Sequence, residues 1–147
     1  MIRIALMVVR SLFRIPSYMY HLIQYGKPDD SHTEYERYTY LRNLVKRVNH
    51  VGRVKVVGYG EENIPEKDGF IMFPNHQGLF DSLAIIETCT HPFGIVIKQE
   101  GARWILVKQV TALLRGIAID RIAIKDSIRM IRQVTEEVKQ GRNYVIF

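Results

Sequence analysis

A chain of 147 residues is long enough to bury a hydrophobic core and fits one domain. Its hydrophobic fraction of 47% and charged fraction of 24% are those of a globular protein, which excludes a disordered chain. The formal net charge of +6 favours an anionic partner, such as a membrane surface, a phosphorylated small molecule or a nucleic acid.

The first 25 residues fit neither a signal peptide nor a spanning helix, because their uncharged apolar run, residues 4–9, is short. The basic side chains of this segment fall on one narrow arc of a helical wheel: Arg3, Arg10, Arg14 and His21. Apolar side chains cover much of the remainder. The pattern predicts a helix in the membrane interface, which Pro16 kinks or breaks into two pieces. The alternative is a core-packing helix with a solvated arginine stripe.

A plausible linker, residues 26–30, separates this segment from the rest of the chain. We therefore expect an N-terminal membrane-anchoring region at residues 1–30 and a second domain at residues 31–147. Ser31 followed by Glu34 forms a capping-box signature at the start of a helix, which the apolar spacing extends to about residue 50.

Short apolar runs then alternate with helical patterns along the remaining chain. Strands are predicted near residues 54–57, 70–73, 93–98, 117–119 and 143–147. Helices are predicted at about residues 81–88, 102–114 and 126–141. This alternation predicts an α/β domain with a largely parallel sheet flanked by helices. Because the chain stops inside an apolar run, we also expect it to be incomplete at its C-terminus.

The sharpest local feature is residues 75–81, NHQGLFD, between a predicted buried strand and a helix. Of the five histidines, only His76 has a carboxylate five positions later, in Asp81. That carboxylate can hold one imidazole nitrogen, so that the other nitrogen acts as a general base. The spacing alone leaves a second interpretation open, in which Asp81 caps a helix and His76 is satisfied within a turn.

Four strings of the chain resemble, in order, signature blocks of the glycerophospholipid acyltransferase family. Residues 73–81, FPNHQGLFD, resemble the first block, and residues 116–121, GIAIDR, look like its glycine-to-arginine block. Residues 98–100, KQE, resemble the lysine segment between them. Residues 141–147, GRNYVIF, look like the approach to a third block, which the family continues with Pro-Glu-Gly-Thr. Over about residues 52–147 the chain is similar to the 1-acylglycerol-3-phosphate (lysophosphatidate) acyltransferases.

The resemblance implies acyl transfer from acyl-CoA or acyl-ACP to lysophosphatidic acid, giving phosphatidic acid in phospholipid biosynthesis. His76 would remove the proton of the acceptor hydroxyl, and Asp81 would orient and support His76. Arg121 and Lys98 would bind the acceptor phosphate, and Asn75 would shape the turn or donate a hydrogen bond. The thioester is a co-substrate, and neither a cofactor nor a metal is expected.

Two alternatives stay open for the function. Within the superfamily, the acceptor could be glycerol 3-phosphate or another lysophospholipid; outside it, the chain could be a non-catalytic peripheral protein that binds anionic lipid. Nucleic acid is not an expected partner, because the aromatic residues are not interleaved with Lys and Arg as a stacking platform requires. The expected location is the cytoplasmic face of the cell membrane, peripheral or monotopic. The single cysteine, Cys89, suits such a reducing compartment.

Overall fold

The computed structural model describes residues 2–29 and 31–147. Met1 and Asp30, the first and last residues of the predicted N-terminal region, lie outside the described residues. In chain order, with η for a 3-10 helix, the elements are α1 (Ile2–Ser11), η1 (Leu12–Arg14), α2 (Ile15–Tyr25), α3 (Glu34–Val51), η2 (Glu61–Asn63), β1 (Ile71–Met72), α4 (Leu79–Thr88), β2 (Phe93–Lys98), η3 (Gly101–Arg103), α5 (Ile105–Leu113), β3 (Ile117–Ile119), α6 (Ile124–Lys139) and β4 (Asn143–Ile146).

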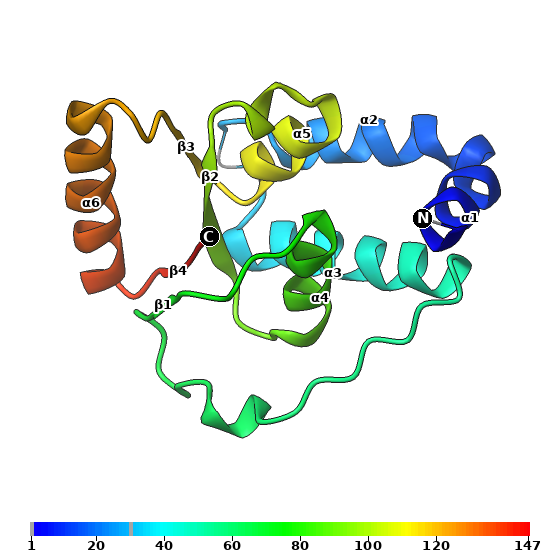
Figure 1. Ribbon diagram of the computed structural model, residues 1–147, viewed down its shortest axis with the longest axis horizontal. Helices are drawn as coiled ribbons and strands as arrows, with labels where there is room; N and C mark the ends of the chain where they lie inside the picture. The colour runs from blue at the N-terminus through cyan, green and yellow to red at the C-terminus, as the bar shows by residue number, and fades with distance from the viewer. Residues whose placement is uncertain (1, 30) are drawn as a thin grey trace.

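The four strands form one parallel sheet in the order β1-β4-β2-β3, which confirms the predicted α/β class. The strand that comes last in the sequence, β4, therefore lies between β1 and β2, where Val145 pairs with Ile95. Figure 1 shows α6 on one face of the sheet and α2, α3, α4 and α5 on the other. Since the strands are parallel, their carboxyl ends share one edge of the sheet.

Side chains alternate between the two faces of the strands, as the period of a β-strand requires. Phe93 and Ile95 belong to the larger core, with Leu41 and Leu113 from the helices of one face. The next residue, Val96, belongs to a second cluster under α6. That cluster also contains Ile119, Val134 and Tyr144. Both faces of the sheet are thus covered, as expected of a parallel sheet.

The N-terminal segment divides into two α-helices, as predicted, but the division lies before Pro16. Helix α1 ends at Ser11, η1 follows, and Pro16 is the second residue of α2. The segment packs on the rest of the fold through Met7 and Leu22, both buried. It also leaves large apolar side chains in solvent, among them Val9 and Phe13. Among the described residues, none of the helices is long and apolar enough to cross a bilayer.

The predicted capping box at Ser31 and Glu34 is wrong by two residues. The helix α3 begins at Glu34 itself, so Thr33 is the N-cap. The Thr33 hydroxyl accepts a hydrogen bond from the Glu36 amide at 3.2 Å, and the Glu36 carboxylate accepts one from the Thr33 amide at 2.8 Å. Ser31 instead donates to the Asp29 carboxylate at 2.5 Å.

The predicted strand at residues 54–57 is also wrong. This segment has no strand assignment and belongs to none of the four strands of the sheet. Its alternating valines resemble a half-buried strand, but an extended chain becomes a strand only beside a hydrogen-bonding neighbour. Three predicted helix starts also shift: α4 and α6 begin two residues early, at Leu79 and Ile124, and α5 begins at Ile105, after η3.

Candidate active site

Each residue of the predicted site lies at or after the carboxyl end of a strand. His76 lies in the loop after β1, Lys98 is the last residue of β2, and Arg121 is the second residue after β3. Phe147 is the residue that follows β4. Because the strands are parallel, these positions share one edge of the sheet, which is the edge where open α/β sheets place their ligands.

The structure brings His76 and Asp81 together, as the motif predicts. The His76 Nδ1 atom lies 3.3 Å from Asp81 Oδ2. The same oxygen accepts hydrogen bonds from the backbone amides of Gln77 at 2.6 Å and Gly78 at 2.9 Å. Asp81 is the third residue of α4, and the N-cap position belongs to Gly78, from whose amide the Asp81 carboxylate accepts a hydrogen bond. The carboxylate therefore stabilises the start of the helix and also lies beside the histidine.

The environment of Asp81 keeps its carboxylate ionised. The amides of Gln77 and then Gly78, which donate to the charged form, together with the neighbouring His76, hold the pKa of this carboxyl below its ordinary value. A charged acceptor at Nδ1 favours the tautomer that carries its proton on that nitrogen. The Nε2 atom is then the lone-pair nitrogen, as a general base requires.

The imidazole of His76 is accessible and has a defined neighbour. Its side chain is 44% exposed, and its ring centroid lies 4.5 Å from that of Phe147, with the rings tilted by 48°. The ring of Phe147 therefore covers part of the imidazole and leaves part of it open to a substrate. Sequence reasoning did not assign Phe147 to the site; its position directly after the last strand was the available signal.

Arg121 reaches the same residue from β3. Its Nη2 atom donates to the backbone carbonyl of Phe147 at 2.5 Å. A guanidinium has five N–H donors, so this contact leaves others for a ligand. Phe147 thus links the two sides of the site, contacting His76 through its ring and Arg121 through its carbonyl.

The two remaining predicted residues, Lys98 and Asn75, have no described contact with His76 or Asp81. The ammonium of Lys98 lies 3.1 Å from the Glu100 carboxylate, in an exposed ion pair that the sequence analysis did not anticipate. That carboxylate partly neutralises the lysine at this edge of the sheet. Asn75 is exposed in the loop between β1 and α4.

Comparisons with known proteins support the family resemblance of the sequence. Residues 55–147 match the model of a protein family described as Acyltransferase. A curated relative, the 1-acyl-sn-glycerol-3-phosphate acyltransferase of Borreliella burgdorferi, is 28% identical to the chain over 107 residues. The match covers 73% of this chain and 43% of that protein, so the chain spans less than half the length of this relative. No solved structure matches the chain.

Proposed function

The chain belongs to the acyltransferase family, and from this premise we propose that it transfers a fatty acyl group from acyl-CoA or acyl-ACP to 1-acylglycerol 3-phosphate. The product is phosphatidic acid. The observation that carries the proposal is the contact of His76 Nδ1 with Asp81 at 3.3 Å, at the carboxyl edge of a parallel sheet. The name of the relative, a 1-acyl-sn-glycerol-3-phosphate acyltransferase, supports the choice of acceptor.

In the proposed reaction, His76 Nε2 takes the proton of the acceptor hydroxyl while its oxygen attacks the thioester carbonyl. Asp81 stabilises the imidazolium that forms. The tetrahedral intermediate then expels the thiolate by breaking the carbon–sulfur bond, and the imidazolium returns its proton to the sulfur. The substrate hydroxyl is the nucleophile, so no acyl-enzyme is needed, in contrast to a serine hydrolase.

Arg121 and Lys98 supply positive charge for the acceptor phosphate in this proposal. The planar guanidinium of Arg121 can donate two parallel hydrogen bonds to phosphate oxygens, which makes it the stronger ligand. Lys98 acts as a point charge that exchanges Glu100 for the phosphate. Asn75 adds a hydrogen-bond donor one residue from His76.

The acceptor is a membrane lipid, and we place the protein at the cytoplasmic face of the cell membrane, peripheral or monotopic. The exposed apolar side chains of the N-terminal helices support this location. Glycerol 3-phosphate and other lysophospholipids are the alternative acceptors, since each carries the same hydroxyl and phosphate chemistry. A non-catalytic lipid-binding protein is the alternative that needs no chemistry at His76.

The test is thiol release from an acyl thioester by the intact protein, with lysophosphatidate as the acceptor. We expect His76→Ala to lower kcat by about 10²–10⁴-fold, the range of a lost general base. Arg121→Ala should mainly raise the acceptor KM, about 10–100-fold for a lost charged hydrogen bond. The exposed Arg132 on α6 provides the control, and Arg132→Ala should leave both constants unchanged. Equal rates in wild type and His76→Ala would favour the lipid-binding alternative.

A further inference from the structure

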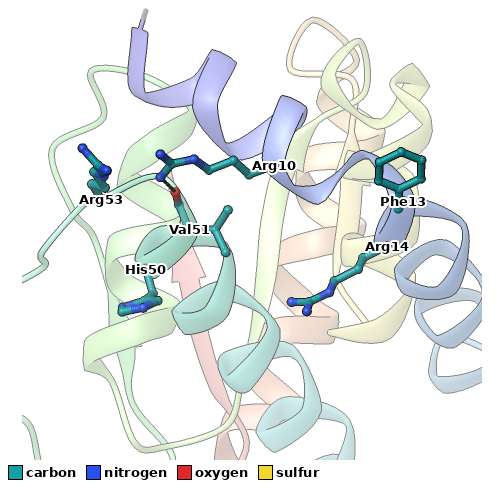
Figure 2. A pocket seen from close by; sticks show the side chains of 6 residues that line it. All are labelled: Arg10, Phe13, Arg14, His50, Val51 and Arg53. Carbon is teal, nitrogen blue, oxygen red and sulfur yellow. Dashed lines mark hydrogen bonds between the residues drawn. The ribbon is translucent and has the colours of Figure 1, made fainter.

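A pocket lies away from the residues of the candidate active site, between the α1–η1 segment and the C-terminal end of α3. Its volume is about 650 Å³, and it is lined by Arg10, Phe13, Arg14, His50, Val51 and Arg53. In Figure 2, Arg10 and Arg14 extend from the N-terminal segment toward the end of α3, and Phe13 lies on the far side from Arg53. Figure 1 places this region at the opposite end of the molecule from α6.

Close packing of α1 on the end of α3 builds the pocket. Gly52 follows the last residue of α3, and a Cβ atom added to it would lie 2.5 Å from the Cγ atom of buried Met7. Glycine therefore allows α1 to approach the chain closely at this point. The next residue, Arg53, has a φ of 54°, which turns the chain away just after the helix. As a result, arginines from two distant segments line one pocket.

The pocket is strongly basic. Within residues 2–29 and 31–147, none of its three arginines forms an ion pair with a carboxylate. Arg10 donates from Nη1 to the Val51 carbonyl at 3.0 Å, which leaves other N–H groups of its guanidinium for a ligand. Three guanidinium groups around one opening favour an oxyanion with several acceptor oxygens.

The C-terminus of α3 carries a partial negative charge, which would repel an anion, because its last carbonyls lack partners within the helix. At this site that repulsion is reduced. The last carbonyls of α3 already accept hydrogen bonds. Val48 accepts from the Gly52 amide at 2.9 Å, and Asn49 accepts from the Val54 amide at 2.9 Å. His50 accepts from the Arg53 amide at 3.0 Å. With the Arg10 contact to Val51, these bonds leave the guanidinium groups as the main charge in the pocket.

The segment that supplies Arg10 and Arg14 to the pocket also carries exposed large apolar side chains, of which Phe13 lines the pocket itself. Phe13 is 96% exposed, and its neighbours in sequence Val9 and Leu12 are 68% and 56% exposed. Exposed apolar groups beside arginines suit the boundary between lipid headgroups and acyl chains. A small anion in solution would use the arginines but would give the apolar groups no partner. The combination therefore selects a lipid over a free phosphate.

We propose that this pocket binds the phosphate of an anionic phospholipid headgroup, while Phe13 and its apolar neighbours enter the acyl layer beside it. The lipid held here is a component of the membrane surface and is separate from the acceptor at His76. The inference rests on the proposed membrane location but not on the proposed acyl transfer. Its test uses no acyl donor or acceptor, so its outcome is independent of the chemistry.

The experiment measures binding of the full chain to vesicles of phosphatidylcholine alone and of equimolar phosphatidylcholine and phosphatidylglycerol. The double variant Arg14→Gln/Arg53→Gln should weaken binding to the mixed vesicles about thirtyfold, the effect of two charges at a lipid surface. The matched control is Lys125→Gln/Arg132→Gln, which removes the same charge from exposed positions on α6. It should change the affinity less than threefold, and thermal unfolding shows whether each variant is folded.

Two further arms separate the possible ligands. Phe13→Ala should weaken binding to both vesicle types about tenfold, because alanine lacks the ring that enters the acyl layer. Calorimetric titration with inorganic phosphate, at constant ionic strength, should show no saturable binding. Equal losses in the two double variants would overturn the proposal in favour of general charge attraction. Saturable phosphate binding that only the Arg14/Arg53 variant loses, with unchanged vesicle binding, would overturn it in favour of a free anion.

Discussion

At the scale of single residues, Asp81 connects the stability of the loop to the chemistry of the candidate site. One carboxylate oxygen accepts the amides of Gln77 and Gly78 and lies 3.3 Å from His76. The loop therefore takes a conformation that also fixes the position of the imidazole. Because Asp81 is at the surface of the molecule, we expect its substitution to change the orientation of His76 more than the stability of the fold.

We predict that Asp81→Asn lowers kcat by about 10²–10⁴-fold while the substrate KM changes little. The amide keeps an oxygen for the backbone amides of the loop, but it loses the charge that supports the imidazolium. Steady-state thiol release with lysophosphatidate measures the effect. A KM increase with an unchanged kcat would contradict the role of Asp81 as a positioning residue for the base.

The pH dependence of unfolding supplies an independent check on the same substitution. Hydrogen bonds from Gln77 and Gly78 lower the pKa of the Asp81 carboxyl in the folded protein. Its contribution to stability is therefore full above the unfolded value of about 3.9 and is lost as the pH falls through the folded pKa. The Tm difference between wild type and Asp81→Asn should accordingly be largest near neutral pH and shrink in acid.

At the scale of elements, the start of α3 shows why a cap must be located in the structure. Two Ser/Thr-x-x-Glu patterns overlap in this segment, at Ser31 and at Thr33, and both satisfy the sequence signature. The structure uses Thr33, because Glu34 is already helical and pairs with Arg142 at 2.8 Å. The competing pattern at Ser31 forms a local bond to Asp29 instead.

Thr33→Ala should therefore lower the free energy of unfolding by about 1 kcal/mol, the ordinary cost of a lost N-cap. Ser31→Ala is the matched control two residues earlier, and we expect a change of at most a few tenths of a kcal/mol. Urea unfolding followed by circular dichroism measures both. A larger loss of unfolding free energy in Ser31→Ala than in Thr33→Ala would show that Ser31 is the N-cap, as the sequence suggested.

The elements that could be predicted are those with strong periodicity or a buried apolar run. The strand at Phe93–Lys98 was predicted with its observed limits, because four consecutive buried residues leave few alternatives. The segment 54–57 carries a similar pattern, but its status depends on a neighbour that the local sequence does not specify. The ring of Phe147 beside His76 also depends on spatial order, since 71 positions separate the two residues.

At the scale of the whole molecule, the order of the strands decides which residues meet at the site. Local patterns predicted a parallel sheet, but they contain no information on the position of β4 between β1 and β2. A long-range polar cluster holds that position. Asn143, the first residue of β4, is 2% exposed and uses both ends of its amide to join segments more than 50 positions away.

These contacts tie the chain before β1 and the chain before β2 to the central strand. The Asn143 Oδ1 atom accepts from the amides of Gly69 at 2.8 Å and Phe70 at 3.2 Å. Its Nδ2 atom donates to the Asp68 carboxylate at 2.8 Å and to the Pro92 carbonyl at 2.9 Å. All four hydrogen-bonding positions of the amide are therefore occupied, and a side chain without them would leave partly buried backbone groups without these partners.

We predict that Asn143→Ala lowers the free energy of unfolding by about 1–3 kcal/mol, since it removes a buried amide and the hydrogen bonds to its partly buried partners. Asn143→Asp separates this loss from a packing effect, because it keeps the shape and the acceptor toward Gly69. The second oxygen of the introduced carboxylate faces the Asp68 carboxylate and the Pro92 carbonyl. We therefore expect Asn143→Asp to destabilise the protein strongly at neutral pH and less strongly as the pH falls.

The exposed Asn43 on α3 is the control, and Asn43→Ala should not destabilise the protein. Equal unfolding midpoints for Asn143→Ala and Asn43→Ala would show that the amide cluster does not hold β4 between its neighbours.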